Sequence, residues 1–201
     1  MPTDTDPNII KLTNVRLSFP HLFEPHAMEE GQEKKFGATF ILDNTEHGKL
    51  LDQIEAAIDR AALDFWKKKT HFKPCLRDGN EKAEMDGYGD GVMFISTSRK
   101  TRPAVVDRQL NPVTSEDNII YAGCYVNATI RLWVQDNKWG KRVNAELRAV
   151  QFVKDGESFG AGPVDAENEF DALEGEESSG STKRSRGRSQ QRSTNSQLDD
   201  L

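Results

Sequence analysis

Two alternating runs of residues constrain the fold of this chain more than any other feature. Residues 125–135 (YVNATIRLWVQ) and residues 142–153 (RVNAELRAVQFV) alternate between apolar and polar side chains, and residues 136–141 (DNKWGK) link them. A period of two is typical of a half-buried strand, and a short link that contains Asn and Gly is typical of a hairpin. The pattern therefore predicts a long antiparallel hairpin with one buried face.

The preceding residues supply more strands and one helix. The expected strands cover residues 9–19, 36–42, 92–98 and 104–107. Pro20 should end the first strand, with Val15, Leu17 and Phe19 on its buried face. Residues 71–91 form a long loop, since they are rich in Gly, Asp and Asn. Several strands, one helix and then a hairpin indicate a mainly β fold, an OB-fold-like five-stranded Greek-key barrel with one inserted helix.

The predicted helix covers residues 47–69, after side chains at 43–45 that could cap it. Its apolar residues recur at intervals of three and four: Leu50, Leu51, Ile54, Ile58, Ala61, Ala62 and Phe65. Lys67, Lys68 and Lys69 lie where the negative end of the helix dipole would favour positive charge. DNA contact is the alternative interpretation of these three lysines.

The last forty or so residues differ from the rest because their charges are sorted. Residues 165–177 carry acids and no base, residues 183–192 carry bases and no acid, and the chain ends in DDL. Their apolar surface is too small to offset the entropy of ordering, which predicts a disordered charged tail over 161–201. We accordingly expect a flexible N-terminus at 1–8 and one folded domain at 9–160. The net charge of −6 does not exclude a nucleic-acid-binding protein, because a basic groove can coexist with acidic segments.

Compartment signals are few. No apolar run approaches the roughly 18 residues of a membrane span, and the N-terminus lacks the pattern of a signal peptide. Cys75 and Cys124 lie far apart in sequence and are expected to be free, buried thiols in a reducing cytosol. No membrane partner is predicted.

The polar face of the first hairpin run is the main candidate site. Its alternate residues are Tyr125, Asn127, Thr129, Arg131, Trp133 and Gln135. Two large aromatic rings flanking an arginine suit single-stranded nucleic acid, because each base stacked on an exposed ring contributes about 1–3 kcal/mol. Lys138, Trp139 and Lys141 in the link, with Arg142, Asn144 and Arg148 on the return strand, add to this surface. The alternative is that loop 71–91 or the helix covers the aromatic rings.

A second candidate surface consists of cations. Arg99, Lys100 and Arg102 directly follow a predicted strand, and Lys34 and Lys35 precede another. Consecutive cations would suit the phosphates of a nucleic acid, and an ordinary solvated turn would also explain them.

Signatures of an enzyme are weak. Residues 87–91 (GYGDG) resemble a phosphate-binding loop, but they lack its lysine and Ser/Thr. The four histidines are scattered, and His71 and Cys75 have no second pair of metal ligands at suitable spacing. The sequence therefore predicts no enzyme, no catalytic residue, no metal site and no cofactor.

Three segments resemble a family of tailed-phage proteins that was long described only as a domain of unknown function. They are RLSFPHLFEP (16–25), KKFGATFIL (34–42) and residues 121–160, which include the hairpin. Its members are similar to phage single-stranded-DNA-binding proteins with an OB-fold. The resemblance implies a protein of the infected host's cytoplasm that coats single strands during replication or recombination. It also implies an acidic tail that occupies the groove or recruits replication partners, although a basic stretch interrupts the tail of this chain.

The leading hypothesis is therefore sequence-independent binding of single-stranded DNA. The predicted contact residues are Tyr125, Arg131, Trp133, Lys138, Trp139, Lys141, Arg142, Arg148, Arg99, Lys100, Arg102, Lys34 and Lys35. The alternatives are a duplex-DNA or RNA-binding module, a phage structural or scaffolding protein, and a nuclease. The tail would bind replication or recombination proteins, and a homodimer is left open.

Overall fold

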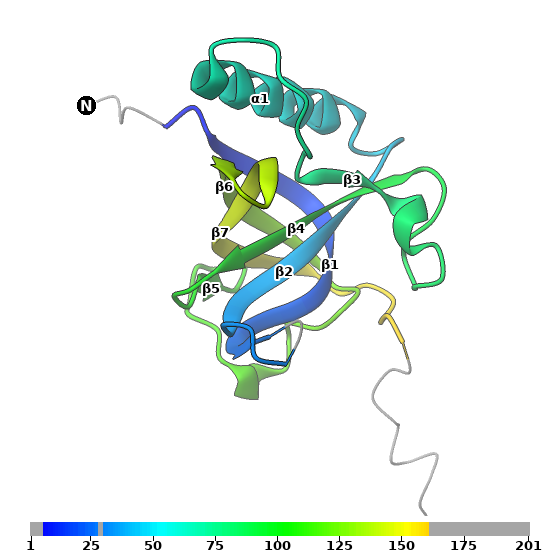
Figure 1. The fold of residues 1–201 in the computed structure, drawn as a ribbon. Helices are drawn as coiled ribbons and strands as arrows, with labels where there is room; N and C mark the ends of the chain where they lie inside the picture. The colour runs from blue at the N-terminus through cyan, green and yellow to red at the C-terminus, as the bar shows by residue number, and fades with distance from the viewer. Residues whose placement is uncertain (1–5, 28–29, 161–201) are drawn as a thin grey trace, which may run out of the picture. The chain divides into compact units, whose positions relative to one another are not determined.

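The computed structural model describes residues 6–27 and 30–160. The elements are β1 (Ile9–His26), β2 (Lys35–Asp43), α1 (Gly48–Trp66), β3 (Leu76–Asp78), η1 (Gly79–Lys82), β4 (Val92–Arg99), β5 (Ala104–Val106), η2 (Ser115–Asp117), β6 (Tyr125–Asn137) and β7 (Gly140–Lys154). Five of the strands close a barrel, and α1 lies across one end of it (Figure 1).

Pairing between strands that are distant in sequence closes the barrel. β1 pairs antiparallel with β2 and β6, β2 pairs with β4, and β6 pairs with β7. The ring is completed where β4 and β7 run parallel, with Thr97 opposite Ala145 and Ser98 opposite Glu146. The short strands β3 and β5 add to β4 and β7. The predicted fold, a five-stranded OB-fold barrel with one helix, is thus confirmed.

The barrel interior is filled by apolar side chains from the inward face of each strand. Among the fully buried ones are Leu12, Leu17, Leu22, Phe40, Leu42, Ile95, Ile130 and Leu147. The predicted buried face of β6 is also confirmed, since Val126, Ala128, Ile130 and Leu132 are buried. Cys75 and Cys124 are buried free thiols, and burial raises the pKa of the Cys75 thiol to about 12.

The first strand is longer than predicted. β1 continues through Pro20, where its register against β2 shifts between Ser18 and His21. A bulge leaves one residue without a ladder partner and tolerates a proline, which has no N–H to donate. Phe19 adopts a left-handed backbone conformation here (φ 48°) and is 41% exposed. The prediction that Phe19 faces the core beside Val15 and Leu17 is therefore wrong.

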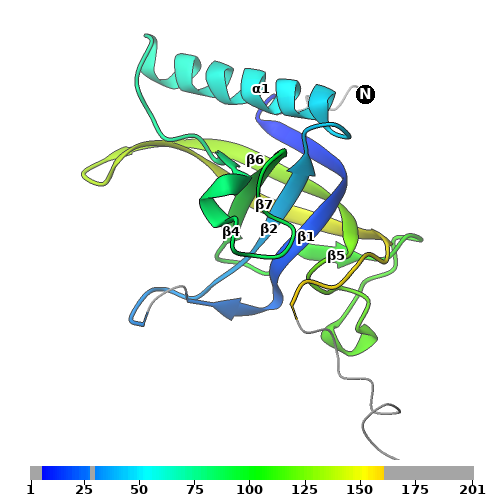
Figure 2. The same ribbon diagram turned by 90° about the vertical axis from the view of Figure 1, so that its right-hand side faces the viewer.

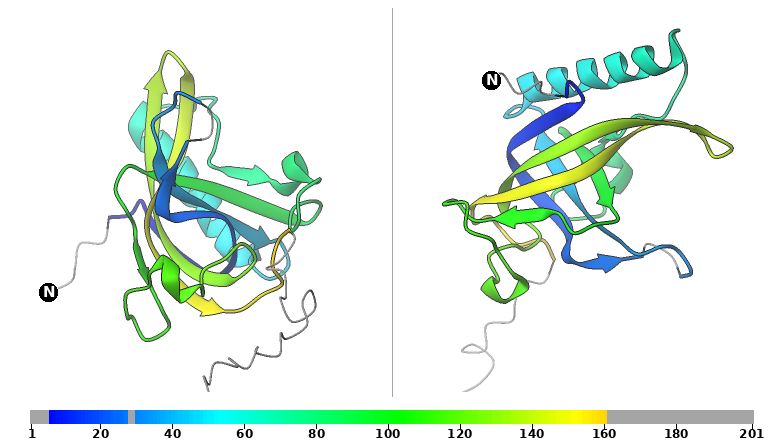
Figure 3. Two further views of the ribbon diagram at one scale, coloured as in Figure 1. Left: turned by 90° about the horizontal axis from the view of Figure 1, so that it is seen from below. Right: turned by 90° about the vertical axis from the view of Figure 1, so that its left-hand side faces the viewer.

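The hairpin is also longer than predicted. The pairing of β6 and β7 extends to Asn137 opposite Gly140, so only Lys138 and Trp139 form the turn. Gly140 has φ 108°, a conformation that side chains other than glycine's rarely adopt. The hairpin extends well beyond the barrel (Figures 2 and 3).

α1 is shorter than the predicted helix. Its buried residues are Leu51, Ile54, Ala57, Ile58, Ala61 and Ala62. Phe65 was expected on this face but is 55% exposed, and Trp66 packs towards the core instead. Lys67 ends the helix in a left-handed conformation, so Lys68 and Lys69 lie beyond its last turn. The N-cap is His47, without a side-chain cap, while Asp43 accepts hydrogen bonds from the backbone N–H groups of Thr45 and Glu46 in the preceding turn.

The segment 71–91 is not a single loop. It contains β3, which extends the sheet beside β4, and the short helix η1. These elements are too short for their periodicity to be visible in the sequence. Over the described part of the chain, no helix combines the length and the apolar character that crossing a membrane requires.

Candidate nucleic-acid interface

A groove crosses the outside of the barrel from β1 to β6. One cavity of about 610 Å³ lies over β1, β2 and β4, and a second of about 730 Å³ lies over β4, β6, β7 and the segment around β3. Lys35, Ser96 and Ser98 line both cavities. The two cavities are therefore parts of one surface feature, here called the barrel groove.

Small and hydroxyl-bearing side chains line the middle of the barrel groove. Thr39 and Ser96 share a hydrogen bond of 3.1 Å between their hydroxyl groups, and the Thr97 hydroxyl donates to the carbonyl oxygen of Ala38 at 2.8 Å. Gly37 is required because a Cβ at this position would collide with the carbonyl oxygen of Thr97 on β4. The result is a floor of small side chains, with the Thr39 and Thr97 hydroxyl groups buried and hydrogen-bonded.

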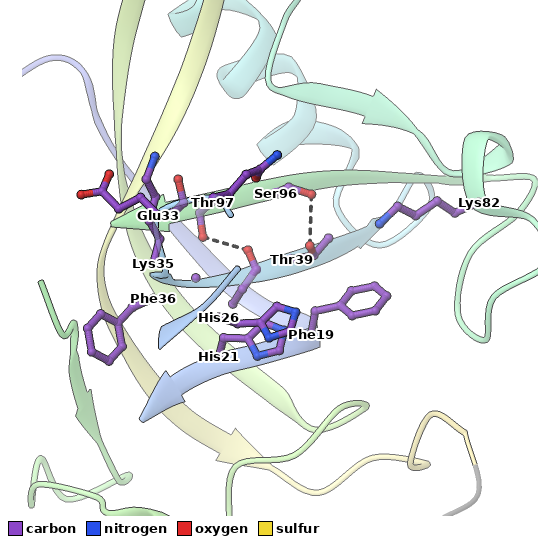
Figure 4. A pocket seen from close by; sticks show the side chains of 14 residues that line it. Phe19, His21, His26, Glu33, Lys35, Phe36, Thr39, Lys82, Ser96 and Thr97 are labelled. Carbon is purple, nitrogen blue, oxygen red and sulfur yellow. Dashed lines mark hydrogen bonds between the residues drawn. The ribbon is translucent and has the colours of Figure 1, made fainter. Parts of the chain in front are cut away.

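Aromatic rings from β1 line one end of the groove. The rings of His21 and His26 stack with centroids 4.3 Å apart, and Phe19 lies beside them (Figure 4). Burial and the neighbouring His26 lower the pKa of His21 below its ordinary value of 6.5. Lys82 reaches this end from η1, with its Nζ 4.7 Å from the centroid of the Phe19 ring. Burial is also the main reason why the pKa of Lys82 is lowered.

None of these residues is among the contact residues predicted from the sequence. Alternation along the strand predicts Phe19 in the core, the four histidines are scattered along the chain, and Lys82 lies in a predicted loop. The one indication in the sequence was that His21 and His26 lie near each other on a segment that also carries Phe19.

Trp133 and polar residues line the other end of the groove. Trp133 is 45% exposed, although the segment around β3 borders the same cavity. Arg142 also lines this cavity, and Asn144 donates a hydrogen bond of 3.2 Å to the side-chain oxygen of Gln135. The path around the barrel wall from β1 through β2, β4 and β7 to β6 covers four strand spacings, or about 19 Å at roughly 4.8 Å each, although β1 and β6 also pair directly on the other side.

Three of the predicted contact residues line the barrel groove, namely Lys35, Trp133 and Arg142. Four further predicted cations form salt bridges with carboxylates. The pairs are Arg99–Glu146 at 3.6 Å and Lys100–Glu33, Arg131–Asp6 and Lys141–Asp136, each at 2.9 Å. These partners are not evident from the sequence, because Glu146, Glu33 and Asp6 lie far from their cations along the chain.

Tyr125 lies at the far end of β6 from Trp133 and does not line either cavity. Its ring lies 5.6 Å from the guanidinium carbon of Arg16 and 4.4 Å from the Nζ of Lys154. Gly156 packs so closely that a Cβ there would be 3.0 Å from this ring. Arg148 is also exposed outside the groove, where it lies close enough to Asp6 to help lower the pKa of that carboxyl.

The remaining predicted residues are distributed around the groove. The guanidinium of Arg102 lies 5.4 Å from the ring of Phe23, and Lys34 is exposed next to Lys35. Lys138 and Trp139 form the hairpin tip, where Trp139 is 73% exposed and the Lys138 Nζ lies 5.1 Å from its ring. Among the described residues, no group of three or more His, Cys, Asp or Glu side chains is placed to hold a metal ion.

An OB-fold barrel with a groove over its second and third barrel strands, here β2 and β4, has the architecture of an oligonucleotide-binding protein. Aromatic rings together with cations are the features that such grooves use for single strands. The family model described as Enterobacter phage Enc34, ssDNA-binding protein, matches residues 8–180. The chain therefore belongs to this family of phage single-stranded-DNA-binding proteins.

Individual relatives agree with this assignment. Protein p50 of Acyrthosiphon pisum secondary endosymbiont phage 1 is 42% identical over 175 residues, which cover 82% of this chain and 93% of p50. The single-stranded DNA-binding protein of bacteriophage Enc34, solved in complex with ssDNA, is 32% identical with a TM-score of 0.68, covering 80% of this chain and 98% of that one. The protein gp2.5 of bacteriophage T7 shares the fold at 15% identity and a TM-score of 0.52, covering 79% of this chain and 96% of gp2.5.

Proposed function

We propose that this protein binds single-stranded DNA in the barrel groove without sequence preference. The observation that carries the proposal is that the two cavities adjoin, with aromatic rings at both ends and small side chains between them. The Enc34 relative solved in complex with ssDNA supports the same ligand class.

Base stacking supplies the attraction that does not depend on sequence. Trp133 offers an exposed ring at one end, and Phe19 with the His21–His26 pair offers rings at the other. Every base has a π-face, so such platforms accept any sequence. The hydroxyl-bearing floor leaves room for sugars and bases without selecting one base.

Cations along the groove neutralise phosphates. Lys35 and Arg142 line it, and Lys82 reaches its β1 end. The salt-bridged cations, including Lys100, are available as well, because an exposed salt bridge contributes only about 0–1 kcal/mol and a phosphate can replace the carboxylate. Binding should weaken as salt rises, because each phosphate contact releases counterions.

The predicted contact residues outside the groove have two roles in this proposal. Lys34, Arg99, Arg102, Lys138, Trp139 and Lys141 extend the binding surface at the groove margins. Tyr125, Arg131 and Arg148 contribute less to binding, since none of them lines either cavity.

Residues 9–160 form the DNA-binding domain in this proposal, and residues 161–201 lie outside the described residues. The acidic run at 165–177 competes with DNA for the groove and limits binding to duplexes. The tail also recruits replication or recombination proteins of the infected host cell. The protein acts there as an accessory factor without enzymatic activity.

Fluorescence anisotropy with labelled oligo-dT and a matched duplex, over a salt series, tests the proposal. The full chain and a version ending at Gly160 should both bind oligo-dT in preference to duplex, the shorter one more tightly. No binding by either version would refute the proposal and favour a structural or scaffolding protein. A strong duplex preference would instead favour a duplex-binding module.

A further inference from the structure

A second group of cations lies outside the barrel groove and was left without a function by the proposal above. Lys67, Lys68 and Lys69 follow α1 and are exposed. The helix dipole accounts at most for Lys67, which is the C-cap of α1, because Lys68 and Lys69 lie beyond the end of the helix. None of the three forms a salt bridge with a described acidic side chain.

The end of α1 is fixed against the β6–β7 hairpin close to its tip. Trp66 donates a hydrogen bond from Nε1 to Oδ2 of Asp136 at 2.7 Å, and the Lys141 Nζ lies 5.2 Å from the centroid of the Trp66 ring. Phe72 packs on the same tryptophan at 5.5 Å. The three lysines therefore begin at a defined place beside β6 and β7.

Lys73 connects this region to the barrel groove. Its backbone N–H donates to the carbonyl oxygen of Lys141, and its own carbonyl oxygen accepts from Val143, both at 3.0 Å. Lys73 also lines the Trp133 end of the groove. It follows Lys69 by four positions, a separation that an extended chain covers in at most about 14 Å.

The hairpin tip extends on the same side of the barrel. Figures 2 and 3 show the C-terminal end of α1 and the tip of the β6–β7 hairpin projecting in the same direction. The tip carries Lys138 and the strongly exposed Trp139. Cations and an exposed indole thus continue outward from the end of the groove where Trp133 lies.

We propose that Lys67, Lys68, Lys69 and Lys73, here called the helix-end track, bind the backbone of single-stranded DNA where it leaves the barrel groove past Trp133. This inference rests on the proposed function and adds a second, mainly electrostatic segment to the same site. A single strand is the occupant because cations next to exposed aromatic rings are what sequence-tolerant single-strand channels combine. A single strand that contacts both the groove and the helix-end track is therefore longer than one that contacts the groove alone.

The test compares two oligo-dT lengths. One OB-fold occupies about 4–16 nucleotides, so an oligonucleotide of about 6 fills only the groove and one of about 20 reaches the track. The variant is the triple change Lys67→Asn, Lys68→Gln and Lys69→Gln. Asparagine is chosen at the first position because Lys67 has φ 55°, which asparagine tolerates. Circular dichroism and the urea midpoint verify that the variant is folded.

The expected result is a loss confined to the long oligonucleotide. Each single-strand phosphate contact contributes about 0.7 to the slope of log affinity against log salt, so three lost contacts lower the slope by about 2. At about 50 mM salt this corresponds to a loss of at least tenfold. Affinity for the short oligonucleotide should change by less than about twofold, since the groove is intact.

A matched control removes the same charge elsewhere. Lys11, Lys49 and Arg108 are exposed cations that line neither cavity, and all three are changed to Gln. This control should lose less than about threefold for either oligonucleotide, because its cations contribute only to the long-range field.

Three results would overturn the inference: an unchanged affinity for the long oligonucleotide, an equal loss for both lengths, or an equal loss in the control. Failure of the proposed function is distinguishable, since the unaltered protein would then bind neither length.

Discussion

Replacing Trp133 with alanine tests the stacking platform of the barrel groove. Stacking of one base on an aromatic ring contributes about 1–3 kcal/mol, and every 1.4 kcal/mol is tenfold in affinity. The Trp133 side chain is 45% exposed, so one face of its indole is available and only one base can stack there. We therefore expect a loss of about 1.5–2 kcal/mol, or roughly 10- to 30-fold, for a short oligo-dT.

The dependence on salt separates stacking from charge. Trp133→Ala removes no cation, so the slope of log affinity against log salt should stay unchanged. Arg142→Gln, at the same end of the groove, should lower that slope by about 0.7. Trp133→Phe should retain most of the affinity because it keeps an aromatic ring.

The assay is anisotropy with a labelled oligo-dT of about 6 nucleotides. Phe65→Ala is the control, since this ring is 55% exposed but lines neither cavity. The reasoning is refuted if Trp133→Ala binds like the unaltered protein, or if Phe65→Ala loses as much affinity.

Four further predictions concern charge and stability. DNA binding, measured by anisotropy, should tighten as pH falls below about 6.5, because a nearby phosphate favours the protonated form of His21, whose pKa is lowered in the free protein. The double variant His21→Gln/His26→Gln should lose this dependence on pH. The lowered pKa of His21 also predicts that the free energy of unfolding of the free protein, measured with urea, decreases as the pH decreases over this range. The reason is that the unfolded chain binds the proton more readily than the folded protein does. Arg16→Ala should lower the free energy of unfolding by about 1–3 kcal/mol, since its guanidinium donates to the carbonyl oxygens of Gly123 and Glu157; a variant with unaltered urea unfolding would contradict this. His47→Ala should likewise cost about 1–3 kcal/mol, because His47 is buried with both ring nitrogens hydrogen-bonded. It should leave short-oligonucleotide affinity within about twofold when measured below the unfolding midpoint, because His47 lines neither cavity.

Regular alternation made the hairpin predictable from the sequence. β6 and β7 follow a period of two over most of their length, so their buried faces could be assigned from residues such as Val126 and Leu132. β2 and β4 do not alternate, and they were recognisable only as short apolar runs. The same rule failed at Phe19 because a bulge shifts the register near Pro20, and a shift of one residue exchanges the two faces of a strand. No local pattern indicated that bulge.

The candidate site was only partly predictable for a similar reason. Trp133 and Arg142 follow from the polar face of the hairpin. The partial burial of Tyr125 depends on Arg16 and Gly156, which belong to other segments of the chain. Lys82 reaches the groove because β3 places η1 beside β4, and so short a strand has no readable period.

The most direct test of the central claim is a cross-linking map of the DNA path. A short oligo-dT with one thymine replaced by iodouracil would be irradiated on the protein, and the modified peptides would be sequenced by mass spectrometry. The account predicts cross-links at Trp133 and at Phe19, His21 or His26, at the two ends of the barrel groove. Cross-links confined to the outer surface around Tyr125 and Arg148 would contradict it.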